Sequence, residues 1–190
     1  MKGKVFLTLV LVVVLLLTVT ASAFARGGNV STYRASLVEL NGSGVTGMVA
    51  ITMLPGQLKV SVWAYGTVPR KPHQQHIHGF ADGSQATVPP PEADTNGDGF
   101  VSLAEAVPYS GPVLLALTPY RSAKRAGFIV FTRVYRGADL AKLNLGDVTI
   151  NRRVVMIHGG YWAPVYGTME YDEMLPVAAG RIVGPIGKSH

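Results

Sequence analysis

Short runs of β-branched and aromatic residues, separated by Gly and Pro, constrain the fold of this chain more than any other feature. The 190 residues include 22 Gly and 12 Pro, and no long stretch has the period of an amphipathic helix. Residues 57–66 alternate instead, with one predicted face formed by Leu58, Val60, Val62 and Ala64. Further β-rich runs occupy residues 44–53, 112–118, 128–135 and 147–158. We therefore predict an all-β fold, an antiparallel sandwich or barrel.

The first 25 residues have the pattern of a secretory signal peptide. Lys2 and Lys4 precede an apolar run, and Ala23-Phe24-Ala25 places small residues where a signal peptidase reads them. The alternative is an uncleaved anchor, because the uncharged run is long enough to span a bilayer when tilted. We predict cleavage before Arg26, no stable membrane span afterwards, and an exported protein in the extracellular space, the cell envelope or the periplasm.

Residues 26–190 have the length of a single domain. The chain has no Cys, so neither a disulfide nor a thiolate metal ligand is available. The formal net charge is +6, carried by small basic groups. These groups favour an anionic surface or an anionic small substrate, or they form an ordinary solvated face. The partner is predicted to be an anionic surface or an unidentified extracellular molecule. No nucleic-acid-binding motif accompanies the charge, and we predict no nucleic-acid partner.

Residues 94–105 match the twelve-residue calcium loop of EF-hand type. Such a loop supplies side-chain oxygens at positions 1, 3, 5, 9 and 12 and a backbone carbonyl at position 7. The predicted Ca²⁺ ligands are Asp94, Asn96, Asp98, Phe100, Ser102 and Glu105. Gly99 permits the sharp turn, and Val101 supplies an apolar anchor. The alternative is an Asp/Asn/Gly-rich surface turn that binds no ion.

The flanks of this loop differ from those of an EF-hand. Pro89-Pro90-Pro91 excludes an ordinary entering helix, and residues 103–107 leave room for barely one helical turn before Pro108. The loop lies in a long polar insertion, residues 81–111, that interrupts the rhythm of strands. We therefore predict a structural Ca²⁺ rather than a sensor, stabilising the folded chain in place of disulfides.

Three of the five histidines form a second candidate site. His76 and His78 would lie on the same face of a strand, with Cα atoms about 7 Å apart. His158 ends another predicted strand, and if the two strands are neighbours the three imidazoles suit Cu or Zn. His73 either adds a fourth ligand or caps the turn after Pro72. The alternative is that these histidines only hydrogen-bond the backbone.

Three motifs occur in the order found in the copper/zinc superoxide dismutase fold. They are His76-Ile77-His78-Gly79, Val155-Met156-Ile157-His158-Gly159-Gly160, and residues 175–184, LPVAAGRIVG. With the calcium loop and Tyr109-Ser110-Gly111-Pro112, they also resemble bacterial proteins with a CHRD domain. The resemblance covers about residues 36–184. It implies a Greek-key β-sandwich or barrel with a calcium-loop insertion, and it implies copper ligation by His76, His78 and His158.

The departures from the dismutase pattern are equally informative. No His lies between Gly79 and Ile157, so the bridging His and the zinc subsite of that family are missing. Ala179 stands where the family has a late Cys. These departures favour a secreted calcium-binding module of CHRD type, with a structural or binding role, over an enzyme. The alternatives are a copper-only dismutase-like oxidoreductase and an extracellular copper-handling protein, and no catalytic residue is assigned.

Overall fold

The computed structural model describes residues 30–143, 150–162 and 168–186. The predicted signal segment and His190 lie outside them. The helices are the 3₁₀ turns η1 (Pro91–Ala93) and η2 (Ile150–Arg152) and the α-helices α2 (Leu103–Ser110) and α3 (Ala138–Lys142). The strands are β1 (Ser31–Glu39), β2 (Thr46–Leu54), β3 (Gln57–Tyr65), β4 (Pro72–His73), β5 (Gln75–His78), β6 (Val113–Ala116), β7 (Arg121–Ser122), β8 (Phe128–Arg136), β9 (Val154–Trp162), β10 (Glu170–Arg181) and β11 (Val183–Ile186).

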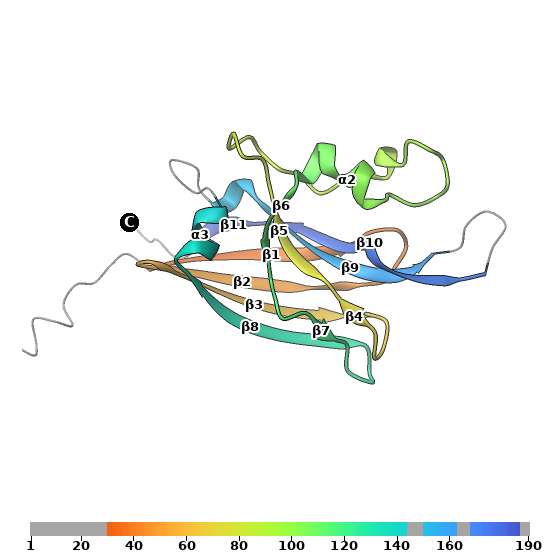
Figure 1. Ribbon diagram of the computed structural model, residues 1–190, viewed down its shortest axis with the longest axis horizontal. Coiled ribbons are helices and arrows are strands. Elements are labelled where there is room, and N and C mark those ends of the chain that lie inside the picture. The colour runs from red at the N-terminus through yellow and green to blue at the C-terminus, as the bar shows by residue number, and fades with distance from the viewer. Residues whose placement is uncertain (1–29, 144–149, 163–167, 187–190) are drawn as a thin grey trace, which may run out of the picture. The chain divides into compact units, whose positions relative to one another are not determined.

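The main sheet runs in the order β6-β5-β9-β10-β1-β2-β3-β8, with β11 paired to β1 (Figure 1). Every strand pairing in it is antiparallel. The strand β1 joins two halves of the sheet, because residues 31–37 pair with β2 whereas Val38 and Glu39 pair with β10. A separate two-stranded ladder joins β4 to β7. The predicted all-β, antiparallel fold is thereby confirmed.

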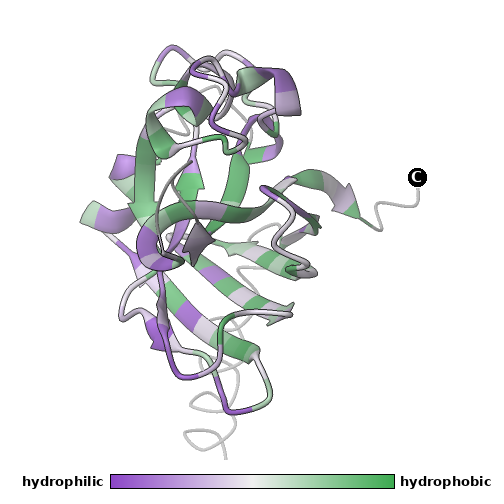
Figure 2. Ribbon diagram, turned by 90° about the vertical axis from the view of Figure 1, so that its right-hand side faces the viewer, coloured by the Kyte–Doolittle hydropathy of each residue, from purple (hydrophilic) through white to green (hydrophobic). Residues whose placement is uncertain are grey.

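The main core contains side chains from both halves of the sheet. Val49 and Val62, from β2 and β3, belong to the same buried cluster as Ile77 and Val155, from β5 and β9. The face predicted for β3 is confirmed, because Leu58, Val60, Val62 and Ala64 are all fully buried. Figure 2 shows hydrophobic and hydrophilic residues alternating along the strands, as expected when one face of a strand is buried and the other exposed.

The insertion at residues 81–111 builds a second core on the opposite face of β9. Val101 and Ala106, from the insertion, cluster there with Val154 and Met156, from β9. Val101 is 5% exposed, so the prediction that it anchors residues 94–105 by an apolar contact is confirmed. Helix α2 lies over this side of the sheet in Figure 1 and contacts β10. The insertion therefore covers the face of β9 to which His158 belongs.

Helix α2 corrects the prediction that one turn ends before Pro108. The helix continues through Pro108 to Ser110, although Pro108 has no N–H to donate to the backbone. The last turn is closed instead by the Ser110 hydroxyl, which donates to the Ala106 carbonyl, and by the Gly111 N–H, which donates to Val107. Before the loop, the proline run leads only into the short turn η1, in line with the predicted absence of an entering helix.

The strands also differ from the predicted runs near the C-terminus. Residues 147–149 of the run predicted at residues 147–158 lie outside the described residues. Its described part forms the turn η2 and then the strand β9, which begins at Val154 and continues to Trp162. The long strand β10 was not predicted, because its first residues are polar and aromatic without a clear alternation. Within the described residues, no helix has both the length and the apolar character that crossing a membrane requires.

Candidate metal centre

The three histidines meet because β5 and β9 are neighbours. In their antiparallel register His76 lies opposite Met156, and His78 lies opposite Val154. Ile77 and Val155 point into the main core, so the alternate positions of both strands face the insertion. His158 lies on this second face of β9, and its backbone N–H donates to the Gln74 carbonyl at 2.8 Å. The strand pairing that the metal prediction required is therefore present.

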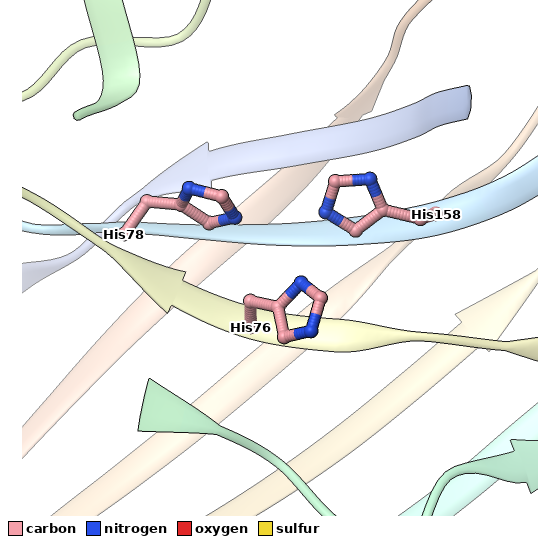
Figure 3. A group of neighbouring side chains, drawn as sticks. All are labelled: His76, His78 and His158. Atoms are coloured by element: carbon pink, nitrogen blue, oxygen red, sulfur yellow. The ribbon is translucent and has the colours of Figure 1, made fainter. Parts of the chain in front are cut away.

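One ring nitrogen from each of these histidines converges on a common point. The three atoms lie within 4.8 Å of one another, and Figure 3 shows them facing the space between the rings. The ring centroids are 5.0 Å apart for His76 and His158, 5.6 Å for His76 and His78, and 5.7 Å for His78 and His158. Among the described residues, no other group of three His or acidic side chains is arranged in this way.

The second nitrogen of each ring is held by a hydrogen-bond partner. His78 Nδ1 lies 3.0 Å from the Gly111 carbonyl oxygen, and His158 Nδ1 lies 2.9 Å from that of Met174. His76 Nε2 lies 2.7 Å from the hydroxyl of Tyr120. The nitrogens left without a partner are His76 Nδ1, His78 Nε2 and His158 Nε2. Buried polar atoms are nearly always paired, so three buried nitrogens without a hydrogen-bond partner in one place indicate a ligand.

Burial keeps these imidazoles neutral. It lowers the pKa of His158 to about 3, with a smaller contribution from the repulsion that protonated His76 and His78 would exert. It lowers the pKa of His76 to about 4, with a smaller contribution from the repulsion that protonated His78 would exert. The pKa of His78 is lowered by burial too, against an opposing hydrogen bond to Gly111. Neutral imidazole is the form that binds a metal, so the site is ready to accept one at neutral pH.

His73 lies outside this group. Its Nδ1 is 3.0 Å from the carbonyl oxygen of His158, and its Nε2 is 3.1 Å from that of Val68. Both ring nitrogens thus face the backbone, which leaves neither available to a shared ion. Of the two roles predicted for His73, capping the turn after Pro72 is nearer to the observed contacts than ligating the ion, because its ring connects this turn to the end of β9.

A close backbone approach positions His78. A Cβ added to Gly111 would lie 2.4 Å from the backbone carbon and oxygen of Gly79, and the φ of Gly111 is +75°. Only glycine fits this position. The approach places the Gly111 carbonyl against His78 Nδ1. The Gly79 and Gly111 pair thereby connects the end of β5 to the end of the insertion.

The predicted calcium loop is wrapped around its own acidic side chains. The Asp94 carboxylate accepts hydrogen bonds from the N–H groups of Gly97 and Gly99, both at 2.8 Å. Asn96 Oδ1 accepts from the N–H of Asp98, and Asp98 Oδ1 accepts from that of Phe100. No described basic side chain forms an ion pair with Asp94, Asp98 or Glu105.

Glu105 closes the loop between its two ends. Its Oε1 accepts from the N–H and the hydroxyl of Thr95, both at 2.9 Å, and from the N–H of Asn96. Its Oε2 accepts from the N–H and hydroxyl of Ser102, in the capping box that starts α2. The hydrogen bonds from Ser102, followed by those from Thr95, lower the pKa of Glu105 to about 2. The carboxylate is therefore ionised at any physiological pH.

No family model and no curated protein matches this chain. The resemblance to CHRD proteins and dismutases therefore rests on the sequence motifs alone.

Sequence reasoning missed the residues that hold the histidines in place. Tyr120 is 44 residues from His76 along the chain and belongs to no recognisable motif. The carbonyls of Gly111 and Met174 act through the backbone, which leaves no signature in residue type. The one sequence signal for these partners was Gly111, at the end of the insertion, because a glycine there permits close approach to another backbone segment.

Proposed function

We propose that this chain is an exported β-domain that binds one Cu or Zn ion through His76, His78 and His158. The observation that carries the proposal is the group of three buried ring nitrogens, without partners, within 4.8 Å of one another. Imidazole is the protein ligand shared by copper and zinc. Export is supported by the N-terminal sequence pattern, and the CHRD resemblance by the order of the histidine motifs.

The hydrogen bonds around the centre support a metal site over a purely structural cluster. Metal-ligating histidines normally donate their other N–H to a carbonyl, a carboxylate or a comparable acceptor, which fixes the ring and its tautomer. His78 and His158 each have a backbone carbonyl in that position, and His76 has a tyrosine hydroxyl. Histidines serving only as hydrogen-bonding groups have no reason to aim their remaining nitrogens at one another.

Metal analysis tests this proposal. The mature protein, purified without a histidine tag, is loaded with Cu²⁺ or Zn²⁺, desalted and analysed for metal content. We expect one ion per chain, retained by His73→Gln and lost from His158→Gln. His73→Gln is the matched control because it also replaces a buried histidine, one whose ring lies against the backbone of β9. Absence of stoichiometric metal in the wild-type protein after both loadings would refute the proposal.

A copper-only dismutase-like oxidoreductase is the second candidate. It is favoured by the three-ligand set, which leaves a coordination position for a small substrate, as catalytic metal sites do. It is opposed by the absence of a bridging histidine between Gly79 and Ile157. Superoxide consumption by the copper-loaded protein, above that of free copper at the same concentration, would establish the enzyme. Full loading without such activity would leave binding or handling of copper as the function.

We also propose a structural Ca²⁺ in the loop at residues 94–105, with Asp94, Asn96, Asp98, Phe100, Ser102 and Glu105 as the candidate ligands. Three carboxylates without a basic partner in the described structure support a cation there. Val101, buried in the second core, would transmit the ordering of the loop to the face that carries the histidines. Calcium would then stabilise the cover of the transition-metal centre.

A further inference from the structure

The three histidines are held by two different kinds of partner. The partners of His78 and His158 are backbone carbonyl oxygens. A carbonyl only accepts hydrogen bonds, so Nδ1 of each ring carries the proton and Nε2 keeps a lone pair. The tautomers of these two rings are therefore fixed by the backbone, with or without an ion.

His76 has a partner that leaves its tautomer free. Its Nε2 lies 2.7 Å from the hydroxyl of Tyr120, and the two rings are nearly perpendicular, with centroids 5.5 Å apart. A tyrosine hydroxyl both donates and accepts. The hydroxyl can therefore donate to Nε2 when this nitrogen carries no proton, and it can accept from Nε2 when this nitrogen is protonated.

The two states of the centre require opposite tautomers of His76. Without an ion, a bare Nδ1 would place three lone pairs against one another in a buried space, which is electrostatically unfavourable. A proton on Nδ1 removes this repulsion, and Nε2 then accepts from Tyr120. With an ion bound, Nδ1 must be bare, so the proton belongs on Nε2 and is donated to the Tyr120 oxygen.

We propose that Tyr120 is a positioning residue that allows His76 to exchange tautomers when the centre takes up a metal. The proton leaves Nδ1 and one is gained at Nε2, while the Tyr120 hydroxyl changes from donor to acceptor and turns its own hydrogen to solvent. Tyr120 is partly exposed, so its hydroxyl hydrogen can turn to water when the hydroxyl becomes an acceptor. His76 and Tyr120 together carry the same number of protons before and after. The inference rests on the proposed metal centre.

Nitrogen-15 NMR of the histidine rings tests the exchange directly, with Zn²⁺ as a diamagnetic probe. In the metal-free wild-type protein we expect the proton of His76 on Nδ1, and after one equivalent of Zn²⁺ we expect it on Nε2. His78 and His158 should keep their proton on Nδ1 in both states. An unchanged tautomer of His76 on Zn²⁺ binding would overturn the proposal. This measurement needs no variant.

Tyr120→Phe provides the second measurement. It keeps the ring and removes only the hydroxyl, and we expect Zn²⁺ affinity to fall about ten- to hundredfold, as when other outer partners of metal ligands are lost. Tyr65→Phe, on the exposed face of β3, is the matched control and should bind as the wild type does. Equal affinity of Tyr120→Phe and wild type would overturn the inference but leave the metal centre standing. Absence of Zn²⁺ binding by the wild type would instead refute the proposed function.

Discussion

The side chain of Asn41 pairs with both backbone polar groups of Val101. The Val101 N–H donates to Asn41 Oδ1 at 2.7 Å, and Asn41 Nδ2 donates to the Val101 carbonyl at 3.0 Å. The same Nδ2 donates to the Pro176 carbonyl of β10 at 2.9 Å. One amide therefore connects the middle of the predicted calcium loop to the sheet, in the manner of a short β-bridge.

Asn41→Asp should loosen this connection. Aspartate can accept from the Val101 N–H, but it cannot donate to the carbonyls of Val101 and Pro176, which would then lose their partner. We expect the free energy of unfolding to fall by about 1–3 kcal/mol. Denaturant unfolding measures the effect, and Gln57→Glu, which alters a partly exposed amide on β3, is the control. A fall no larger than that of the control would show that the bridge contributes little.

Calcium should stabilise the folded protein through the loop. At a free concentration one hundred times Kd, a ligand that binds only the folded state adds about 2.7 kcal/mol to the free energy of unfolding. We expect thermal unfolding to shift upward in millimolar Ca²⁺ relative to chelator, and we expect Asp94→Ala and Glu105→Gln each to abolish the shift. Identical melting curves of the wild type in calcium and in chelator would rule out a structural ion.

The metal-free protein should lose stability as the pH falls from about 6.5 to about 4. Burial lowers the pKa of His76 to about 4 and of His158 to about 3, below the ordinary value of 6.5. Between these values the unfolded chain binds more protons than the folded chain, so the free energy of unfolding falls with falling pH. Each such histidine contributes about 1.4 kcal/mol per pH unit at most.

The urea midpoint, measured from pH 7 to pH 4 in the presence of a chelator for transition metals, checks this dependence. His158→Gln should show a shallower slope than the wild type, because one lowered pKa has been removed. A wild-type midpoint that is constant over this range would mean that the three rings are protonated equally in the folded and unfolded states.

Gly111→Ala should damage both the fold and the metal centre. The backbone of Gly111 has φ +75° and ψ 173°, and an added Cβ would collide with Gly79. Such a conformation costs a residue with a side chain about 1–3 kcal/mol, before the collision is counted. We expect lower stability and weaker Zn²⁺ binding, since the carbonyl of residue 111 would no longer hold His78. Gly97→Ala is the control, because it shares a positive φ but has open space around it.

The part of the site that follows from strand periodicity was predictable from the sequence. The spacing of His76 and His78 placed them on one face, and the glycines after His78 and His158 marked the ends of two runs. That these runs are neighbours could only be supposed, because pairing of strands about eighty residues apart depends on the whole sheet. The pairing of β5 with β9, which brings the three histidines together, could not be predicted from the sequence.

Residues acting through tertiary contacts were not predictable. Tyr120 reaches His76 from the segment after β6, and Asn41 reaches Val101 from the turn after β1, and neither position has a local signal. Local rules also failed where other contacts overrode them. Helix α2 passes through Pro108 because its capping box and the buried residues Ala106 and Ser110 stabilise it more than the missing hydrogen bond destabilises it.

The four-residue strand β5 lies between β6 and β9 and is hydrogen-bonded along both of its edges. His76 and His78 are therefore carried by a backbone that cannot shift without breaking its hydrogen bonds to both neighbouring strands. A bound ion would therefore be coordinated by three nitrogens in fixed positions rather than by ligands that adapt to it. For a metal with two oxidation states, this rigidity would give the oxidised and the reduced ion nearly the same coordination geometry. The reorganisation energy of electron transfer would then be small.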